Sequence, residues 1–245
     1  MRGFKTRLLG AGVVMLLATI GTATASADVA AGPPRPTDKQ LRTIDPATTC
    51  LRGTARPWID QVEPRLQAFL PGAETTNQYT VDFELFTLAD SQVIWTGTSF
   101  PKNPGQTGLW TQALELPPQL QDATTYGWHA RVSDGTTTSA WSRTCELTVD
   151  TVKPNSPGLT ITPAEQPYKV GQTITLNFTN AGSADVTKYG FSVLSQEPNT
   201  FVPARTGTAK VKLTEAGPSY INAWSYDKAG NESFEPTNIR ITVVS

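Results

Sequence analysis

The chain has 245 residues, of which 38% are hydrophobic and 17% are charged, and its formal net charge is −1. Its 20 lysines and arginines are scattered among 21 acidic residues, so the sequence lacks the cationic footprint that nucleic-acid binding requires. The length allows one or two domains, and a split in the residue pattern favours two.

The first 27 residues have the features of a secretory signal peptide. Basic residues precede an apolar run from Leu8 to Ile20, and small residues follow up to Ala27. The apolar run is shorter than the about 20 residues that a membrane span needs. We therefore expect cleavage after Ala27, a secreted mature chain and no membrane insertion after cleavage.

The rest of the chain divides into an arm and two predicted domains. Residues 28–46 are rich in proline and lack apolar periodicity, which predicts a disordered or extended arm. From Ala47 onward, short runs that alternate between apolar and polar residues are separated by turn residues, as in an all-β sandwich or barrel. A strand near Asp150 runs directly into Pro154 and Pro157, which predicts a short linker. We expect two tandem β-sandwich domains, residues 47–150 and 151–245.

Thirteen strands are predicted from the alternating runs. In the first domain they lie near 58–62, 65–69, 79–87, 92–95, 110–116, 126–133 and 145–149, and in the second near 159–162, 172–179, 188–194, 209–213, 219–226 and 239–244. The apolar faces of 79–85 and 126–132 should meet in one core, because antiparallel sheets bury one face. Trp58, Trp128 and Trp141 are expected to pack near the cysteines, and Trp95 and Trp110 to lie at a domain edge.

Cys50 and Cys145 are the two cysteines of the chain. An even pair in an exported protein indicates a disulfide. Free thiols or metal ligands are the alternatives, but a zinc site needs about four ligands and the neighbourhood offers none beyond His129. We predict a disulfide, no metal and no cofactor.

Several motifs resemble a known family. Four motifs look like the fibronectin type III-like or immunoglobulin-like repeats of large secreted actinobacterial proteins: Arg56–Ile59, Tyr126–Gly135, Ser139–Ser142 and Cys145–Thr151. Asp185–Ser192 and Tyr226–Ser233 are similar to the module that usually follows such a repeat. The resemblance covers about Thr48 to Val244, and in such proteins these units look like spacers or adhesion modules. It implies a fold and a compartment, and no binding residue.

Two groups of residues carry side chains that occur in hydrolase sites. His129 could serve a Ser-His-Asp site with Ser133 or Ser142, but neither serine has a nucleophile elbow around it, and a solvated strand histidine is the favoured interpretation. Asp82 and Glu84 share one strand face about 7 Å apart, a spacing that glycosidase acids can use, although solvent-facing acids are ordinary on a sandwich.

The segment from Asp227 to Asn231 could bind calcium through its oxygen atoms. A hairpin turn in which Asp227 accepts hydrogen bonds from nearby amides and Gly230 has a positive φ explains the same residues, and we favour it. Asp134-Gly135 is interpreted in the same way.

An aromatic strand is the candidate binding site. If Ile221, Ala223 and Ser225 face the core, then Tyr220, Asn222, Trp224 and Tyr226 line the outer face, where sugar rings could stack. A shift of one residue in register would bury the aromatics instead.

The sequence therefore predicts a secreted, non-enzymatic binding, adhesion or spacer protein of the cell envelope or extracellular space. Its partner would be an extracellular polysaccharide or a protein. The alternatives are an accessory protein of an extracellular hydrolase, and an interaction or inhibitor module that presents a loop such as 99–108.

Overall fold

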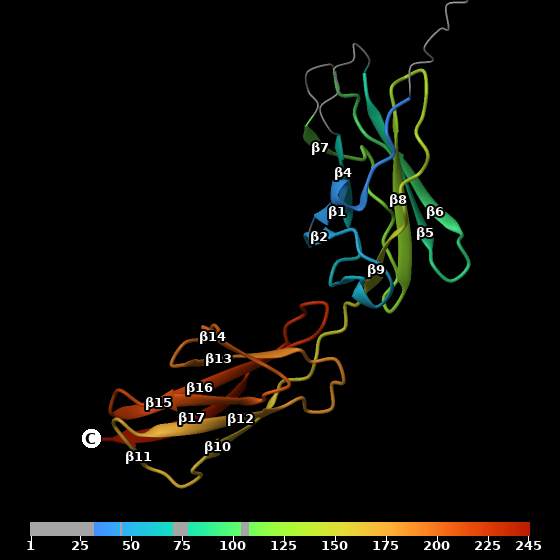
Figure 1. The fold of residues 1–245 in the computed structure, drawn as a ribbon. Helices are drawn as coiled ribbons and strands as arrows, with labels where there is room; N and C mark the ends of the chain where they lie inside the picture. The colour runs from blue at the N-terminus through green and yellow to red at the C-terminus, as the bar shows by residue number, and fades with distance from the viewer. Residues whose placement is uncertain (1–31, 45, 71–77, 104–107) are drawn as a thin grey trace, which may run out of the picture. The chain divides into compact units, whose positions relative to one another are not determined.

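The computed structural model describes residues 32–44, 46–70, 78–103 and 108–245. They form two β-sandwiches, drawn in Figure 1 from blue to yellow-green for the first and from yellow to red for the second. The predicted signal peptide, residues 1–27, lies outside the described residues. Among the described residues, no helix has the length and apolarity to cross a membrane.

The first sandwich consists of a four-stranded and a five-stranded sheet. The four-stranded sheet has the order β2-β1-β4-β7, and the five-stranded sheet has the order β3-β9-β8-β5-β6. The bounds are β1 (Leu41–Ile44), β2 (Thr48–Thr49), β3 (Trp58–Ile59), β4 (Arg65–Leu70), β5 (Thr80–Thr87), β6 (Val93–Thr98), β7 (Leu109–Gln112), β8 (Thr125–Ser133) and β9 (Cys145–Val149).

One core joins these two sheets. Val81, Phe83 and Leu85 of β5 are buried beside the Trp128 face of β8, as the alternation predicted. Side chains of β1 and β4 cover them from the opposite sheet. The other faces of β5 and β8 carry half-buried polar and aromatic residues, which is the pattern of an antiparallel sheet with one wet side.

The second sandwich consists of a three-stranded sheet, β10-β12-β15, and a five-stranded sheet, β11-β17-β16-β13-β14. The bounds are β10 (Gly158–Thr162), β11 (Tyr168–Lys169), β12 (Thr173–Thr179), β13 (Lys188–Val193), β14 (Thr200–Pro203), β15 (Thr208–Lys212), β16 (Gly217–Tyr226) and β17 (Thr237–Val244). Its separate core contains Ile174, Leu176, Ile221, Ala223 and Ile241, all fully buried.

The thirteen predicted strands are present, and four further strands were missed. β1 lies within the predicted arm, residues 28–46, and β2 lies just after it. The prediction of an arm is therefore wrong from Leu41 to Ile44. β1 pairs with β4 along its whole length, which satisfies backbone groups that an arm would leave to water. β11 and β14 were missed because each is short, at 2 and 4 residues, and each contains or adjoins a proline.

Cys50 and Cys145 form the predicted disulfide, which closes a sequence separation of 95 residues. It ties the loop after β2 to the first residue of β9. The linker that follows β9 is also held by hydrogen bonds. Asp122 accepts from the Thr151 amide at 2.6 Å, and Asn155 donates to the Ala181 carbonyl at 3.0 Å.

Candidate functional site

The aromatic strand is β16, and its outer face is covered for most of its length. Ile221 and Ala223 belong to the core of the second sandwich, so of the two registers left open by the sequence the structure has the one that places the aromatics on the other face. On the other face Tyr220 is 44% exposed, whereas Asn222, Trp224 and Tyr226 are 2%, 4% and 9% exposed. The expectation of a flat, exposed platform made of all four residues is therefore wrong.

A covering segment explains this burial. Residues 194–199 join β13 to β14, which is the edge strand of the same sheet, and side chains of this loop and of β14 lie over the outer face at Gly190 of β13. Phe201 of β14 packs edge-on against Tyr226 at 5.6 Å between ring centroids, and Asn222 donates to the Ser195 carbonyl at 2.6 Å. Alternation alone cannot predict such a cover, because a covered outer face has the same period as an exposed one.

The outer face of the first sandwich carries a stack of four side chains from three segments. Phe86 of β5 packs against His129 of β8, His129 stacks on Trp141 at 4.2 Å between ring centroids, and the Arg131 guanidinium lies 4.4 Å from the Trp141 ring. Trp141 was expected to pack near the cysteines, and the structure corrects this. Its segment instead pairs along β8, because Ser139 and Ser142 accept hydrogen bonds from the Val132 and Ala130 amides.

The candidate catalytic side chains all have hydrogen-bond partners, and Ser133 donates to the Thr137 carbonyl in the turn after β8. His129 Nε2 lies 2.8 Å from Glu84 Oε2, and Arg131 Nε donates to Asp82 Oδ2 at 3.1 Å. Ser142 Oγ accepts from the Ala130 amide and donates to the Arg143 carbonyl, so the backbone orients this hydroxyl and His129 does not. His129 is half-buried between its neighbours, in contrast to the solvated histidine that we expected. Cross-strand pairs of this kind stabilise a sheet.

The two aspartate turns are as predicted. Asp227 Oδ1 accepts from the Gly230 and Asn231 amides at 2.8 and 2.9 Å, and Gly230 has a φ of 99°. Asp134 accepts from the Thr136 and Thr137 amides, and Gly135 has a φ of 85°. The amide hydrogen bonds from Thr137 and Thr136 hold the pKa of the Asp134 carboxyl well below its usual value.

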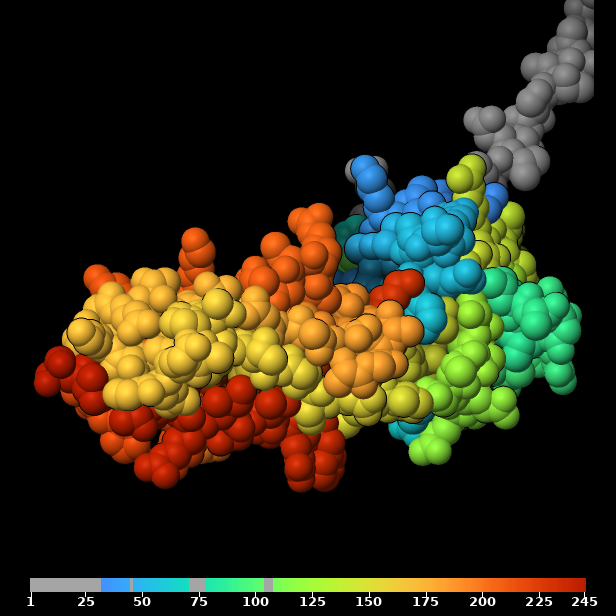
Figure 2. All heavy atoms as spheres, turned by 90° about the horizontal axis from the view of Figure 1, so that it is seen from below, coloured from blue at the N-terminus to red at the C-terminus, as the bar shows by residue number. Residues whose placement is uncertain are grey.

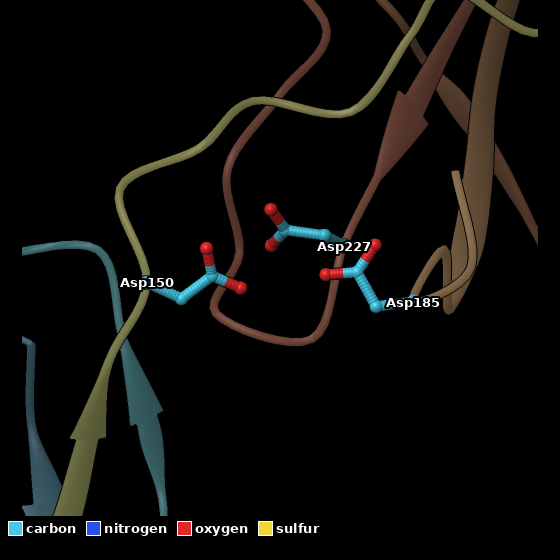
Figure 3. A group of neighbouring side chains, drawn as sticks. All are labelled: Asp150, Asp185 and Asp227. Atoms are coloured by element: carbon cyan, nitrogen blue, oxygen red, sulfur yellow. The ribbon is translucent and has the colours of Figure 1, made fainter. Parts of the chain in front are cut away.

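A cluster of three carboxylates lies where the linker leaves β9. Asp150 is the first residue after β9, Asp185 precedes β13 and Asp227 follows β16, and one oxygen of each lies within 4.8 Å of the others. Figure 3 shows the three carboxylates turned toward one another. No sequence motif marks this cluster, because its members lie far apart in the chain.

Oxygen donors of this kind are the ligands that calcium prefers, but calcium takes about six to eight of them. Both oxygens of Asp227 already accept hydrogen bonds from its own turn. Burial, followed by the negative charges of Asp227 and Asp185, raises the pKa of the Asp150 carboxyl. The cluster is therefore a site of like-charge repulsion that favours a proton or a cation.

Comparisons with known proteins agree on the fold. No protein-family model and no curated protein matches the sequence. The FN1-FN3 domains of chicken CNTN1 are similar in structure, with a TM-score of 0.57 and 9% identity over 87% of this chain and 66% of that chain. The fibronectin(III)-like modules of Clostridium thermocellum CbhA are similar with a TM-score of 0.53 and 14% identity, over 83% of this chain and 93% of that chain.

At these identities the likeness concerns the fold alone. The actinobacterial origin that the sequence motifs suggested stays a prediction. With its strand order, its two cores and these neighbours, the chain has the architecture of tandem fibronectin type III-like, immunoglobulin-like β-sandwiches.

Proposed function

We propose that the mature chain is a secreted, non-enzymatic protein that binds or spaces other molecules in the cell envelope or extracellular space. The observation that carries the proposal is the pairing of the ionisable side chains on the outer face of β5 and β8. Its His129, Glu84, Asp82 and Arg131 are paired with one another or stacked, in the manner of groups that hold a sheet together. The fold supports the same conclusion, because sandwich modules present loops and faces on a rigid frame.

The partner in this proposal is an extracellular polysaccharide or a protein. The test is a glycan array and a set of immobilised envelope proteins, both probed with residues 28–245 produced by secretion. We expect saturable retention on at least one of them, and an N-terminus at Asp28 in the secreted protein. Retention on neither would contradict the binding role.

The enzymatic alternative has its own test. A hydrolase that used the pair Asp82 and Glu84 would release reducing sugar from polysaccharides, and Glu84→Gln would abolish that release. We expect no release from either protein. Release by the unmodified chain that is lost in Glu84→Gln would overturn the non-enzymatic proposal.

An exposed aromatic favours the interaction-module alternative over the hydrolase accessory. Phe100 is 64% exposed in the segment 99–108, of which residues 104–107 lie outside the described part of the chain. If a partner protein binds through this loop, Phe100→Ala should weaken retention on that protein and leave polysaccharide retention unchanged.

A further inference from the structure

A cationic hollow lies beside the disulfide of the first sandwich. It has a volume of about 500 Å³ and is lined by Arg35, Pro36, Thr37, Asp38, Lys39 and Arg143. The basic residues come from segments more than 100 positions apart, so no local sequence pattern indicates that they meet. Figure 2 shows the N-terminal segment, in blue, against the cyan segment that follows β1.

Both walls of this hollow are anchored. On one wall Pro33 and Pro36 are buried, and the chain continues into β1, where the Leu41 carbonyl accepts from the Cys50 amide. On the other wall Arg143 follows the buried Ser142 and lies two residues before Cys145. Because Cys50 and Cys145 are bonded to each other, the disulfide fixes the two walls relative to one another.

The charges that line the hollow are unbalanced. Its carboxylate, Asp38, is held in an ion pair by Arg52. Arg35, Lys39 and Arg143 are exposed and make no ion pair among the residues that the structure describes. Three positive side chains around one hollow raise the local concentration of anions. Guanidinium groups also bind the oxygens of carboxylates and phosphates in a bidentate manner.

We propose that the cationic hollow binds an anionic group, a carboxylate or a phosphate ester, carried by an extracellular polymer. This inference rests on the binding function proposed above and names the class of its ligand. The volume lies within the range of about 300 to 1,000 Å³ that is usual for small-ligand sites. It therefore suits a charged residue of such a polymer.

The test compares the retention of the unmodified protein with that of two variants. The hollow variant carries Arg35→Gln, Lys39→Gln and Arg143→Gln, all at exposed positions that should leave folding intact. The control variant carries Lys169→Gln, Arg205→Gln and Lys210→Gln, which remove the same charge from exposed positions of the second sandwich. Each protein, with its disulfide intact, is run in native gels that contain polygalacturonate, poly(glycerol phosphate) or neutral dextran.

We expect the unmodified protein and the control variant to be retained by at least one anionic polymer and not by dextran. The hollow variant should bind that polymer at least about tenfold more weakly than the unmodified protein does. Added salt should weaken the binding of all three proteins, because the basic side chains are exposed. The polygalacturonate and poly(glycerol phosphate) gels distinguish a carboxylate from a phosphate ligand.

Two results would overturn the inference. Equal retention of the hollow and control variants would show that the hollow does not hold the anion, while the binding function itself would stand. Retention by dextran alone, or by none of the three polymers, would exclude an anionic ligand, and the glycan array and envelope proteins would then decide the binding function separately.

Discussion

Gly190 of β13 lies directly opposite Trp224 of β16, and the absence of its side chain lets the outer face of the second sandwich close. A Cβ at this position would lie 2.9 Å from atoms of Phe201, Pro198 and Tyr226. We expect Gly190→Ala to lower the free energy of unfolding of the second sandwich by about 1 to 3 kcal/mol, the usual cost of overpacking.

Denaturant unfolding followed by tryptophan fluorescence measures this effect, because Trp224 is the tryptophan of the second sandwich. The exposed substitution Lys210→Ala serves as the control and should change stability by less than about 0.5 kcal/mol. Unchanged stability of Gly190→Ala, together with solvent-exposed emission from Trp224, would mean that the cover is absent and that the aromatic platform is open.

The aromatic strand illustrates what sequence patterns can and cannot predict. Period two correctly placed Ile221 and Ala223 in the core, because one face of every strand must pack. It could not predict that the loop 194–199 and the Phe201 ring cover the other face, since that depends on Pro198 of the loop and Phe201 of the edge strand meeting Gly190 of β13. The same limit applies to Trp141, which follows β8 in an irregular segment and stacks back on side chains of β8, and to the walls of the cationic hollow.

The Cys50–Cys145 disulfide should dominate the stability of the first sandwich. In the chain-entropy model, closing a loop of this length contributes about 4 to 5 kcal/mol. We expect the double variant Cys50→Ala, Cys145→Ala to lose most of that free energy of unfolding in the first sandwich and none in the second, which has a core of its own. Urea unfolding monitored by amide exchange measures the free energy of unfolding of each sandwich. An equal loss of stability in the two sandwiches would contradict independent cores.

Arg131 and Trp141 should be energetically coupled. Their cation–π contact and the shared stack with His129 predict a coupling of roughly 0.5 to 1 kcal/mol in a double-mutant cycle of Arg131→Gln and Trp141→Leu. The matched control pairs Arg131 with Trp110, a tryptophan of β7 that contacts Arg42 instead. A coupling near zero for Arg131 and Trp141, or an equal one for the control, would refute the stack.

Ser225 and Ser233 are buried serines that should respond in opposite directions. The Ser225 hydroxyl is fully buried and has no hydrogen-bond partner among the described residues, so Ser225→Ala should raise the free energy of unfolding by up to about 1 kcal/mol. Ser233 Oγ accepts from the Ser225 amide and donates to the Glu235 carbonyl. Its replacement by alanine takes this acceptor from the buried Ser225 amide, while the Glu235 carbonyl keeps its bond from the Ser156 hydroxyl, and should cost about 1 to 3 kcal/mol. Thermal unfolding measures the stability of both variants relative to the unmodified protein. A loss of stability in Ser225→Ala would contradict the prediction, because it would mean that the Ser225 hydroxyl has a hydrogen-bond partner.

Asp150 is the first residue after β9, Asp122 of the loop before β8 contacts the next residue, Thr151, and the two aspartates should give pH profiles of stability with opposite sign. Hydrogen bonds from Thr151 lower the pKa of Asp122, whereas burial and neighbouring carboxylates raise the pKa of Asp150. A lowered pKa gives stability that is present above the unfolded-state pKa and lost as pH falls. A raised pKa gives stability that is present below the unfolded-state pKa and lost as pH rises through the folded-state value.

At neutral pH, therefore, Asp150→Asn should stabilise the protein, by roughly 0.5 kcal/mol, because it removes repulsion and keeps an acceptor for the Val152 amide. Asp122→Asn should destabilise it, since a neutral amide is the weaker acceptor for Thr151. The difference in stability between each variant and the unmodified protein should shrink near pH 3. There the native carboxyl of Asp150 is protonated, and the stability that the Asp122 charge provides is being lost as pH falls. Unfolding measured in a chelator keeps bound cations out of the comparison. A destabilised Asp150→Asn under these conditions would mean that its charge is compensated by a group other than the carboxylates beside it.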